Sequence, residues 1–105
     1  MTVQLDFHGA SGSDYRFFLI EQQAVSPTGG NFIYARQSPD GLAVLLVGEA
    51  ENLSVLARER WPEAQSQWGA THLFIRLNVT AAMRRREQQD LVEAYAPPMN
   101  VAPEA

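Results

Sequence analysis

The chain contains neither cysteine nor lysine. Without cysteine it can form no disulfide and offers no thiolate for nucleophilic attack or zinc binding, so a bound metal would need oxygen or histidine ligands. All eight cationic side chains are arginines. Arginine is well suited to bidentate contacts with phosphate or carboxylate, although a bias in genomic base composition would also favour it over lysine.

Long apolar runs are absent as well. The longest, residues 42–47, has six residues, whereas a helix that spans a membrane needs about 20. The N-terminal region lacks a basic segment followed by an apolar one, which is the pattern of a secretion signal. We therefore expect a cytoplasmic protein without membrane contact.

The formal net charge of −4 argues against a general nucleic-acid coat, because neutralisation of phosphates supplies most non-specific binding. A local basic patch is compatible with this charge. Arginines concentrate at residues 84–86, and another lies at position 76. Arg76, Arg84 and Arg85 are candidates for contacts with nucleic acid or with an acidic partner. The alternative is a solvated helix whose acidic residues offset the arginines.

Five segments have the composition of β-strands. Polar and apolar residues alternate over residues 2–8, residues 15–20 are mostly aromatic or apolar, and a turn rich in glycine and serine joins the two into a hairpin. Further strands are predicted at residues 32–36, 42–47 and 71–77. Gly48 is expected to end the fourth strand and let the backbone turn.

Two regions have the composition of helices. Asn52 is a suitable N-cap for a helix over residues 53–61. Pro62 either interrupts this helix or opens a second short one, where its missing amide costs nothing. Thr80 is expected to cap a helix that runs to Tyr95, before the two prolines at 97 and 98 stop it.

The order of these elements, four strands, a helix, a strand and a helix, predicts an α+β fold with a small, mainly antiparallel sheet flanked by helices. At 105 residues the chain fits one domain with a single hydrophobic core. Residues 1–29 are expected to form an N-terminal hairpin and linker within this domain, residues 30–100 its main part, and residues 101–105 a frayed tail.

Short motifs between residues 30 and 100 occur in an order and spacing that resemble those of the GIY-YIG nuclease family. Gly30-Asn31-Phe32 stands where that family has Gly-Ile-Tyr, and Leu46-Val47-Gly48 stands where it has Tyr-Ile-Gly. The segment from Glu49 to Leu53, which contains Asn52, looks like the strand-to-helix link of the family. Leu91-Val92, Tyr95, Pro97-Pro98 and Asn100 are similar to its closing Leu-Ile, Tyr, Pro-Pro and Asn.

The resemblance implies a GIY-YIG-like core with an extra N-terminal hairpin. It also implies a site where two tyrosines, a helix arginine and a glutamate that holds one divalent metal, such as Mg²⁺, cleave a phosphodiester bond. In this chain Phe32 and Leu46 stand at the tyrosine positions, and Leu56 stands at the arginine position. The glutamate position falls on Gln88, with Glu87 beside it. Because hard cations prefer carboxylates, Glu87 is the metal-ligand candidate if there is one.

Three nearby residues are candidates to replace the missing groups. Tyr34 lies two residues after Phe32 and therefore on the same side of the strand. Arg60 lies one helical turn after Leu56. Glu87 neighbours Gln88 on the last helix.

These observations lead to three hypotheses for function. The first is a catalytically degenerate GIY-YIG-like domain that acts as a binding or interaction module, with nucleic acid as one candidate ligand and no cofactor. The second is an active Mg²⁺-dependent DNA endonuclease that uses Tyr34, Arg60 and Glu87. The third is a structural protein–protein interaction domain in which the strand at residues 3–7 is a pairing edge.

Overall fold

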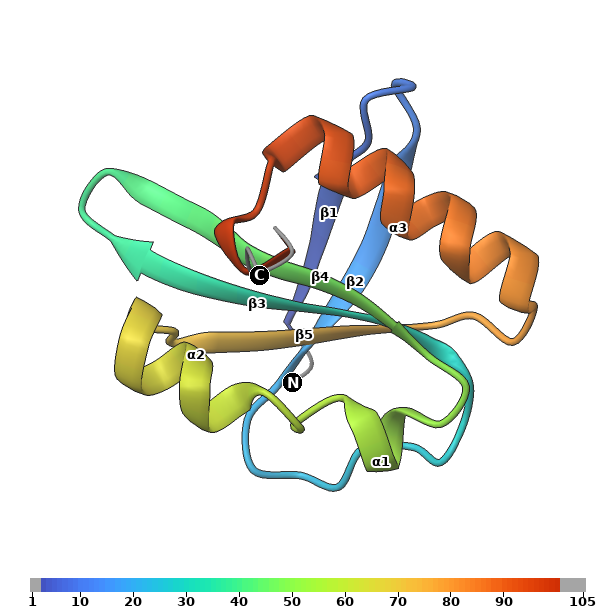
Figure 1. Ribbon diagram of the computed structural model, residues 1–105, viewed down its shortest axis with the longest axis horizontal. Helices are drawn as coiled ribbons and strands as arrows, with labels where there is room; N and C mark the ends of the chain where they lie inside the picture. The colour runs from blue at the N-terminus through green and yellow to red at the C-terminus, as the bar shows by residue number, and fades with distance from the viewer. Residues whose placement is uncertain (1–2, 101–105) are drawn as a thin grey trace, which may run out of the picture.

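The computed structural model describes residues 3–100, which form an α+β domain around one five-stranded antiparallel sheet (Figure 1). The strands are β1 (Gln4–His8), β2 (Asp14–Ile20), β3 (Gly30–Ser38), β4 (Gly41–Ala50) and β5 (His72–Leu77), and their order in the sheet is β1-β2-β5-β3-β4. The helices are α1 (Leu53–Leu56), α2 (Trp61–Trp68), α3 (Ala81–Tyr95) and the short 3₁₀ helix η1 (Pro98–Asn100). The predicted α+β class is confirmed, whereas the predicted tail at 101–105 lies outside the described residues.

The sheet is covered by helices on both faces, α1 and α2 on one and α3 on the other (Figure 1). Alternating strand residues supply a separate apolar cluster to each face. The cluster under α1 and α2 includes Phe32, Tyr34, Leu46, Leu53 and Ile75. The cluster under α3 includes Phe7, Phe17, Ile33, Val47, Phe74 and Leu91. The sheet therefore divides the core into two layers, so the prediction of a single hydrophobic core is wrong.

Strand β4 is longer than its sequence suggests. It continues through Gly48 to Ala50 and pairs with β3 from Gly41 to Ala50, with a shift in register that leaves Leu45 without a partner in β3. The prediction that Gly48 ends the strand is therefore wrong. Gly48 lies opposite Phe32, and a Cβ atom at Gly48 would lie 2.2 Å from Cζ of the Phe32 ring. Glycine is required here because the Phe32 ring lies directly against the backbone of Gly48. Close approach of another group to the backbone is a recognised reason for glycine within a strand.

The helical segment after β4 is divided in two. Asn52 caps α1 as predicted, and its Oδ1 accepts a hydrogen bond from the amide of Ser54 at 3.0 Å. Helix α1 ends at Leu56 rather than at Trp61, and Pro62 lies in the first turn of α2. Of the two alternatives for Pro62, the second is therefore correct: proline opens a new helix where no amide hydrogen bond is lost.

Helix α3 has the predicted bounds. It begins directly after Thr80 and ends at Tyr95. Thr80 stands at the N-cap position as predicted, but the prediction that its side chain caps the helix is wrong, because that side chain makes no capping hydrogen bond. Ala96 follows in the left-handed conformation, with φ of 45°, and leads into Pro97 and η1. Among residues 3–100, no helix has the length and apolar character needed to cross a membrane.

Candidate functional site at the edge of strand β4

Residues at the positions that resemble the GIY-YIG motifs surround one short stretch of β4, from Leu46 to Gly48. Phe32 on β3 and Leu46 lie in the apolar cluster under α1 and α2, and the Phe32 ring lies over Gly48. Gln88 on α3 and Asn100 on η1 approach the same stretch from elsewhere in the chain, where both bond to the backbone of Val47. Segments far apart in sequence therefore meet at one edge of the sheet.

Asn100 completes the hydrogen bonding of this edge. The Val47 amide donates to Oδ1 of Asn100 at 2.7 Å, and Nδ2 of Asn100 donates to the Val47 carbonyl at 2.8 Å. Nε2 of Gln88 donates to the same carbonyl at 3.0 Å. Asn100 thus takes the place of a further strand beside Val47 and satisfies backbone groups that an edge strand otherwise leaves open.

Gly30 allows three elements to approach closely at the start of β3. A Cβ atom at this position would lie 2.3 Å from the carbonyl oxygen of Arg76 on β5 and 2.6 Å from Cδ1 of Leu53 on α1. The amide of Leu53 donates to the carbonyl of Thr28 at 2.9 Å, which holds the start of α1 beside this strand. The role of Gly30 in the structure is steric.

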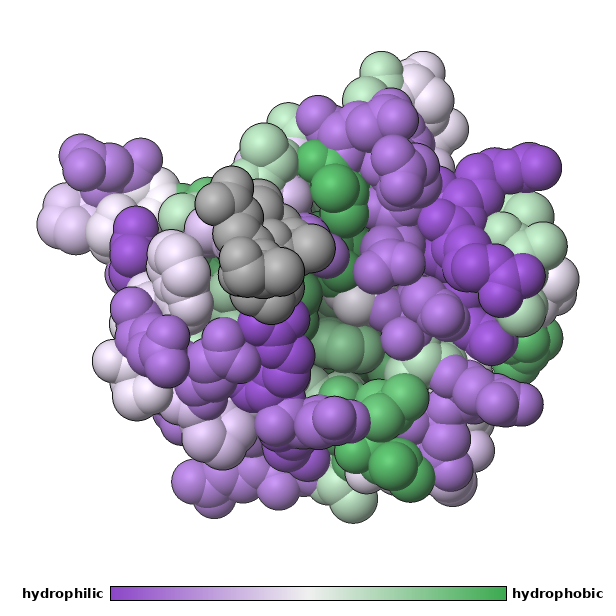
Figure 2. All heavy atoms as spheres, in the orientation of Figure 1, coloured by the Kyte–Doolittle hydropathy of each residue, from purple (hydrophilic) through white to green (hydrophobic). Residues whose placement is uncertain are grey.

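Hydrocarbon fills the three positions at which the resemblance calls for two tyrosines and an arginine. Phe32 and Leu46 are buried in the cluster under α1 and α2, and Leu56 is partly buried against it. Pockets lined by described residues lie elsewhere, one of about 250 Å³ beside Arg58 and Trp61 and another of about 350 Å³ beside Ser11, Tyr15 and Asp90. Phe32, Leu46 and Leu56 line neither pocket. Apolar side chains are visible at the surface over α1 and between α1 and α3, bordered by hydrophilic residues (Figure 2).

Tyr34 is completely buried beside Phe32. Its hydroxyl donates to the carbonyl of Ala57 at 2.7 Å, and its ring makes an edge contact with Trp61 at a centroid distance of 5.2 Å. Burial raises the pKa of Tyr34 to about 12. The hydroxyl is therefore protonated near neutral pH, and its hydrogen bond is made to the Ala57 carbonyl. It is not placed to act as a general base.

Arg60 connects α2 with η1. Its Nε and Nη2 donate to the carboxylate of Glu63 at 3.1 and 3.0 Å, and its Nη1 donates to the carbonyl of Met99 at 3.1 Å. Arg60 therefore lies next to the segment that carries Asn100, with its charge offset by Glu63.

Glu87 and Gln88 point in different directions from α3. Oε1 of the buried Glu87 accepts from Nε of Arg76 on β5 at 2.9 Å, whereas Gln88 reaches Val47 on β4. Gln88 is thus the member of this pair that contacts the Leu46–Gly48 stretch. The structure does not bring the three substitute candidates to one point, because Tyr34 lies under α1 and α2 while Glu87 lies on the face covered by α3.

The residues present at this edge do not fit a divalent metal. Gln88 and Asn100 use their amide groups on the backbone, and the carboxylate of Glu87 is paired with Arg76. In the part of the chain that the structure describes, no three histidine, aspartate or glutamate side chains lie together in a way that could hold a metal ion. Mg²⁺ prefers carboxylate and water oxygens in octahedral geometry.

The three arginines considered for nucleic-acid contact differ in environment. Arg84 is only 5% exposed, pairs with Glu49 at 2.9 Å and donates to the carbonyls of Asn78 and Val79. Arg76 is partly buried between Glu87 and the ring of Tyr15, whose centroid lies 5.5 Å from its guanidinium carbon. Arg85 is exposed. These three arginines therefore do not share one open basic surface.

Sequence reasoning missed the polar core beneath the first turns of α3. The completely buried Asn31 donates from Nδ2 to the carbonyls of Gly48 and Arg84 at 3.3 and 3.0 Å, and its Oδ1 accepts from Asn78. The sequence carried no clear signal for this, because Asn31 lies just before the strand predicted at residues 32–36, whereas in the structure β3 begins at Gly30. A buried amide of this kind has to satisfy its donors and acceptor, and here it does so by joining β3, β4 and α3.

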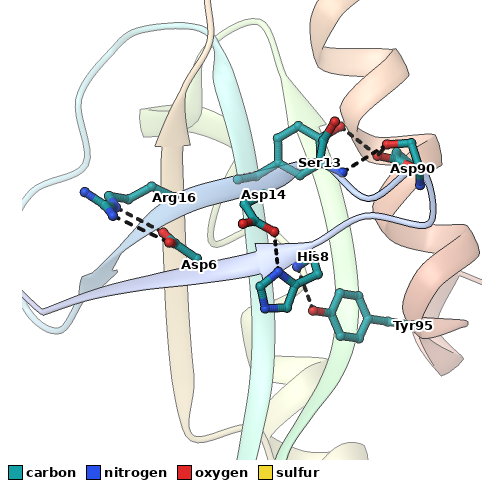
Figure 3. A network of polar contacts seen from close by, with 9 residues as sticks. Asp6, His8, Ser13, Asp14, Arg16, Asp90 and Tyr95 are labelled. Atoms are coloured by element: carbon teal, nitrogen blue, oxygen red, sulfur yellow. Dashed lines mark hydrogen bonds and ion pairs between the residues drawn. The ribbon is translucent and has the colours of Figure 1, made fainter.

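A second polar network that the sequence did not reveal holds the β1–β2 hairpin against α3 (Figure 3). Asp90 accepts from the amide and hydroxyl of Ser11 at 2.8 and 2.6 Å and from the hydroxyl of Tyr15 at 2.7 Å. These bonds, that from Ser11 foremost, lower the pKa of Asp90. On β1, His8 pairs with Asp14, whose hydrogen bond raises the pKa of His8, and the His8 amide donates to the Tyr95 hydroxyl at 3.0 Å.

Comparisons of the chain with models of protein families, with characterised proteins and with solved structures found no match.

Proposed function

We propose that this chain is a catalytically inactive GIY-YIG-like domain that acts as a binding module. The observation that carries the proposal is the arrangement at the edge of β4. Residues from β3, α3 and η1 surround Leu46 to Gly48, and the positions where the resemblance calls for reactive groups hold Phe32, Leu46 and Gln88. A scaffold of this kind with hydrocarbon and amides in place of acids and hydroxyls is suited to binding rather than to hydrolysis.

The chemical requirements of phosphodiester cleavage support the same view. The reaction needs a base for water, a positive charge at the phosphate and a metal at the leaving oxygen. Tyr34 has a buried, protonated hydroxyl, the charge of Arg60 is offset by Glu63, and Gln88 is neutral. Loss of one acid–base group costs roughly 10²- to 10⁴-fold in rate, and several are missing here.

A protein is a better candidate partner than a nucleic acid. The net charge is −4, and Arg76 and Arg84 already pair with Glu87 and Glu49. Phosphate binding would have to break these pairs or rely on exposed arginines that form no ion pair among the described residues, namely Arg36, Arg58, Arg85 and Arg86. Non-specific nucleic-acid affinity comes mainly from the number of phosphates that are neutralised, and Arg36 and Arg58 already donate to the backbone carbonyls of Trp68 and Gln23.

The proposal can be tested by incubating the purified protein with Mg²⁺ and fluorescently labelled branched or single-stranded DNA. We expect no cleavage above the rate in buffer and only weak, salt-sensitive changes in anisotropy. Glu87→Gln is the matched control, because it keeps the size of the side chain and removes the carboxylate that is the metal-ligand candidate. Cleavage by the wild-type chain that this substitution abolishes would show an active nuclease and refute the proposal.

A further inference from the structure

The two edges of the sheet differ in how their backbone groups are used. At β4 the Val47 groups are bonded to Asn100 and Gln88. At β1 the backbone groups of successive residues alternate between bonding to β2 and facing away from the sheet. The amide of Leu19 donates to the carbonyl of Val3 at 2.9 Å, so the odd-numbered residues of β1 bond to β2 and the even-numbered ones face away from the sheet.

In β1 the backbone amide and carbonyl groups that face away from the sheet belong to Gln4, Asp6 and His8. The amide of His8 is taken by the hydroxyl of Tyr95 at 3.0 Å. Among the residues described, nothing bonds to the backbone amide or carbonyl groups of Gln4 and Asp6 on this side. This short stretch is therefore open to another strand, and open edges of this kind pair readily.

Exposed apolar side chains accompany the open backbone groups. Val3 is 54% exposed and Leu5 is 38% exposed. Leu5 lies opposite Phe17 in the register and therefore on the face of the sheet that carries α3. A strand that is added outside β1 would cover both side chains and extend the apolar cluster that contains Phe7 and Phe17.

We propose that β1 pairs antiparallel with β1 of a second copy of this chain, about a two-fold axis at Leu5, so that the two sheets become continuous. In this register the backbone groups of Gln4 bond to those of Asp6 of the second copy, and the reverse. Leu5 lies opposite Leu5 of the second copy in a non-hydrogen-bonded pair, where Cβ atoms are about 4.5–5.5 Å apart.

The charge of Asp6 favours this register over the one that is shifted by two residues. A shift of two residues would place Asp6 opposite Asp6 of the second copy and would need the amide of His8, which already bonds to Tyr95. Like charges directly opposite one another destabilise a strand pair. In the proposed register Asp6 faces the neutral Gln4, while its carboxylate stays paired with Arg16 at 3.0 Å (Figure 3).

Analytical ultracentrifugation over a range of protein concentrations tests the pairing. We expect the wild-type chain to approach twice its monomer mass as concentration rises. Asp6→Pro removes an outward amide that the monomer does not use, so it should leave the monomer folded and abolish association. Asp6→Ala keeps the amide and should still associate. A wild type that remains monomeric throughout, or association that survives Asp6→Pro, would overturn the proposal.

Single cysteines test the register, because the chain has no cysteine of its own. Under mild oxidation Leu5→Cys should form a disulfide-linked dimer quickly, since the two substituted positions face one another. Gln4→Cys on the same strand and Val55→Cys on the exposed surface of α1 should cross-link slowly. Equal rates for all three variants would indicate random collisions and refute the register. This readout does not depend on Asp6→Pro being stable.

Discussion

Phe32 and Tyr34 show how the position of one hydroxyl decides what a residue can do. They lie two residues apart on β3, face the same side and have ring centroids 5.6 Å apart. Phe32 has no hydroxyl, and the hydroxyl of Tyr34 is buried and donates to Ala57. The sequence correctly placed both side chains on one face, but it could not show that the hydroxyl is engaged inside the core.

The contact between Gly48 and Phe32 can be tested by enlarging the glycine. Gly48→Ala would place a methyl group into the Phe32 ring, and overpacking of a core typically costs about 1–3 kcal/mol of unfolding free energy. Urea unfolding of Gly48→Ala, Phe32→Leu and the double variant would measure this cost. We expect the double variant to be more stable than the sum of the single effects implies. Simple additivity would mean that the ring does not restrict this position.

Tyr34 should make the protein sensitive to alkali. A phenol has a pKa of about 10 when unfolded, and burial raises the pKa of Tyr34 to about 12. Its stabilising contribution is thus complete below the unfolded pKa and is lost as pH rises through the folded pKa. Tyr34→Phe should cost about 0.5–1.5 kcal/mol at neutral pH and should flatten the loss of stability in alkali. An unchanged alkaline profile in chemical denaturation would contradict this assignment.

At the scale of elements, the strands and the α+β class were predictable because alternation and turn residues are local features of the chain. The continuation of β4 through Gly48 was not, because its cause is a ring on β3. The division between α1 and α2 was left open for a similar reason, since Pro62 is compatible with either outcome. The sheet order depends on long-range pairing that no local pattern specifies.

The hydrogen bonds of η1 to β4 provide an element-scale test. Asn100→Ala removes a donor and an acceptor from the backbone of Val47, and we expect it to cost about 1–3 kcal/mol. Asn100→Asp keeps the acceptor for the Val47 amide but replaces the donor with a carboxylate oxygen that repels the Val47 carbonyl. Hydrogen exchange of that amide should accelerate in Asn100→Ala and much less in Asn100→Asp. Equal exchange rates in both variants and the wild type would show that η1 does not protect this edge.

The stability that comes from the contact of the β1–β2 loop with α3 should decrease at acidic pH. Hydrogen bonds lower the pKa of Asp90, so its contribution is present above the unfolded aspartate pKa of about 3.9 and is lost as pH falls through the lower folded value. We expect Asp90→Asn to destabilise the protein at about pH 7 and to differ less from wild type at about pH 3. A difference that stays constant between these two pH values would contradict the role of the carboxylate.

At the scale of the whole molecule, the candidate site depends on contacts among elements that are remote in the chain. The motif positions could be named from their order in the sequence. Their meeting at Val47 results from the pairing of β3 with β4 and from the docking of α3 and η1, and only the structure shows these contacts. The open edge at β1 and the covered edge at β4 likewise follow from the complete sheet.

The proposal of an inactive domain depends most on the claim that the residues beside Val47 do not hold a metal, because Gln88 and Asn100 bond to the backbone and Glu87 pairs with Arg76. The most direct measurement is a titration of isotope-labelled protein with Mn²⁺, followed by paramagnetic broadening of the amide signals in nuclear magnetic resonance spectra. We expect no selective, saturable broadening at Val47, Gln88 and Asn100. Selective broadening that saturates at these residues and disappears in Glu87→Gln would demonstrate a metal site and contradict the claim.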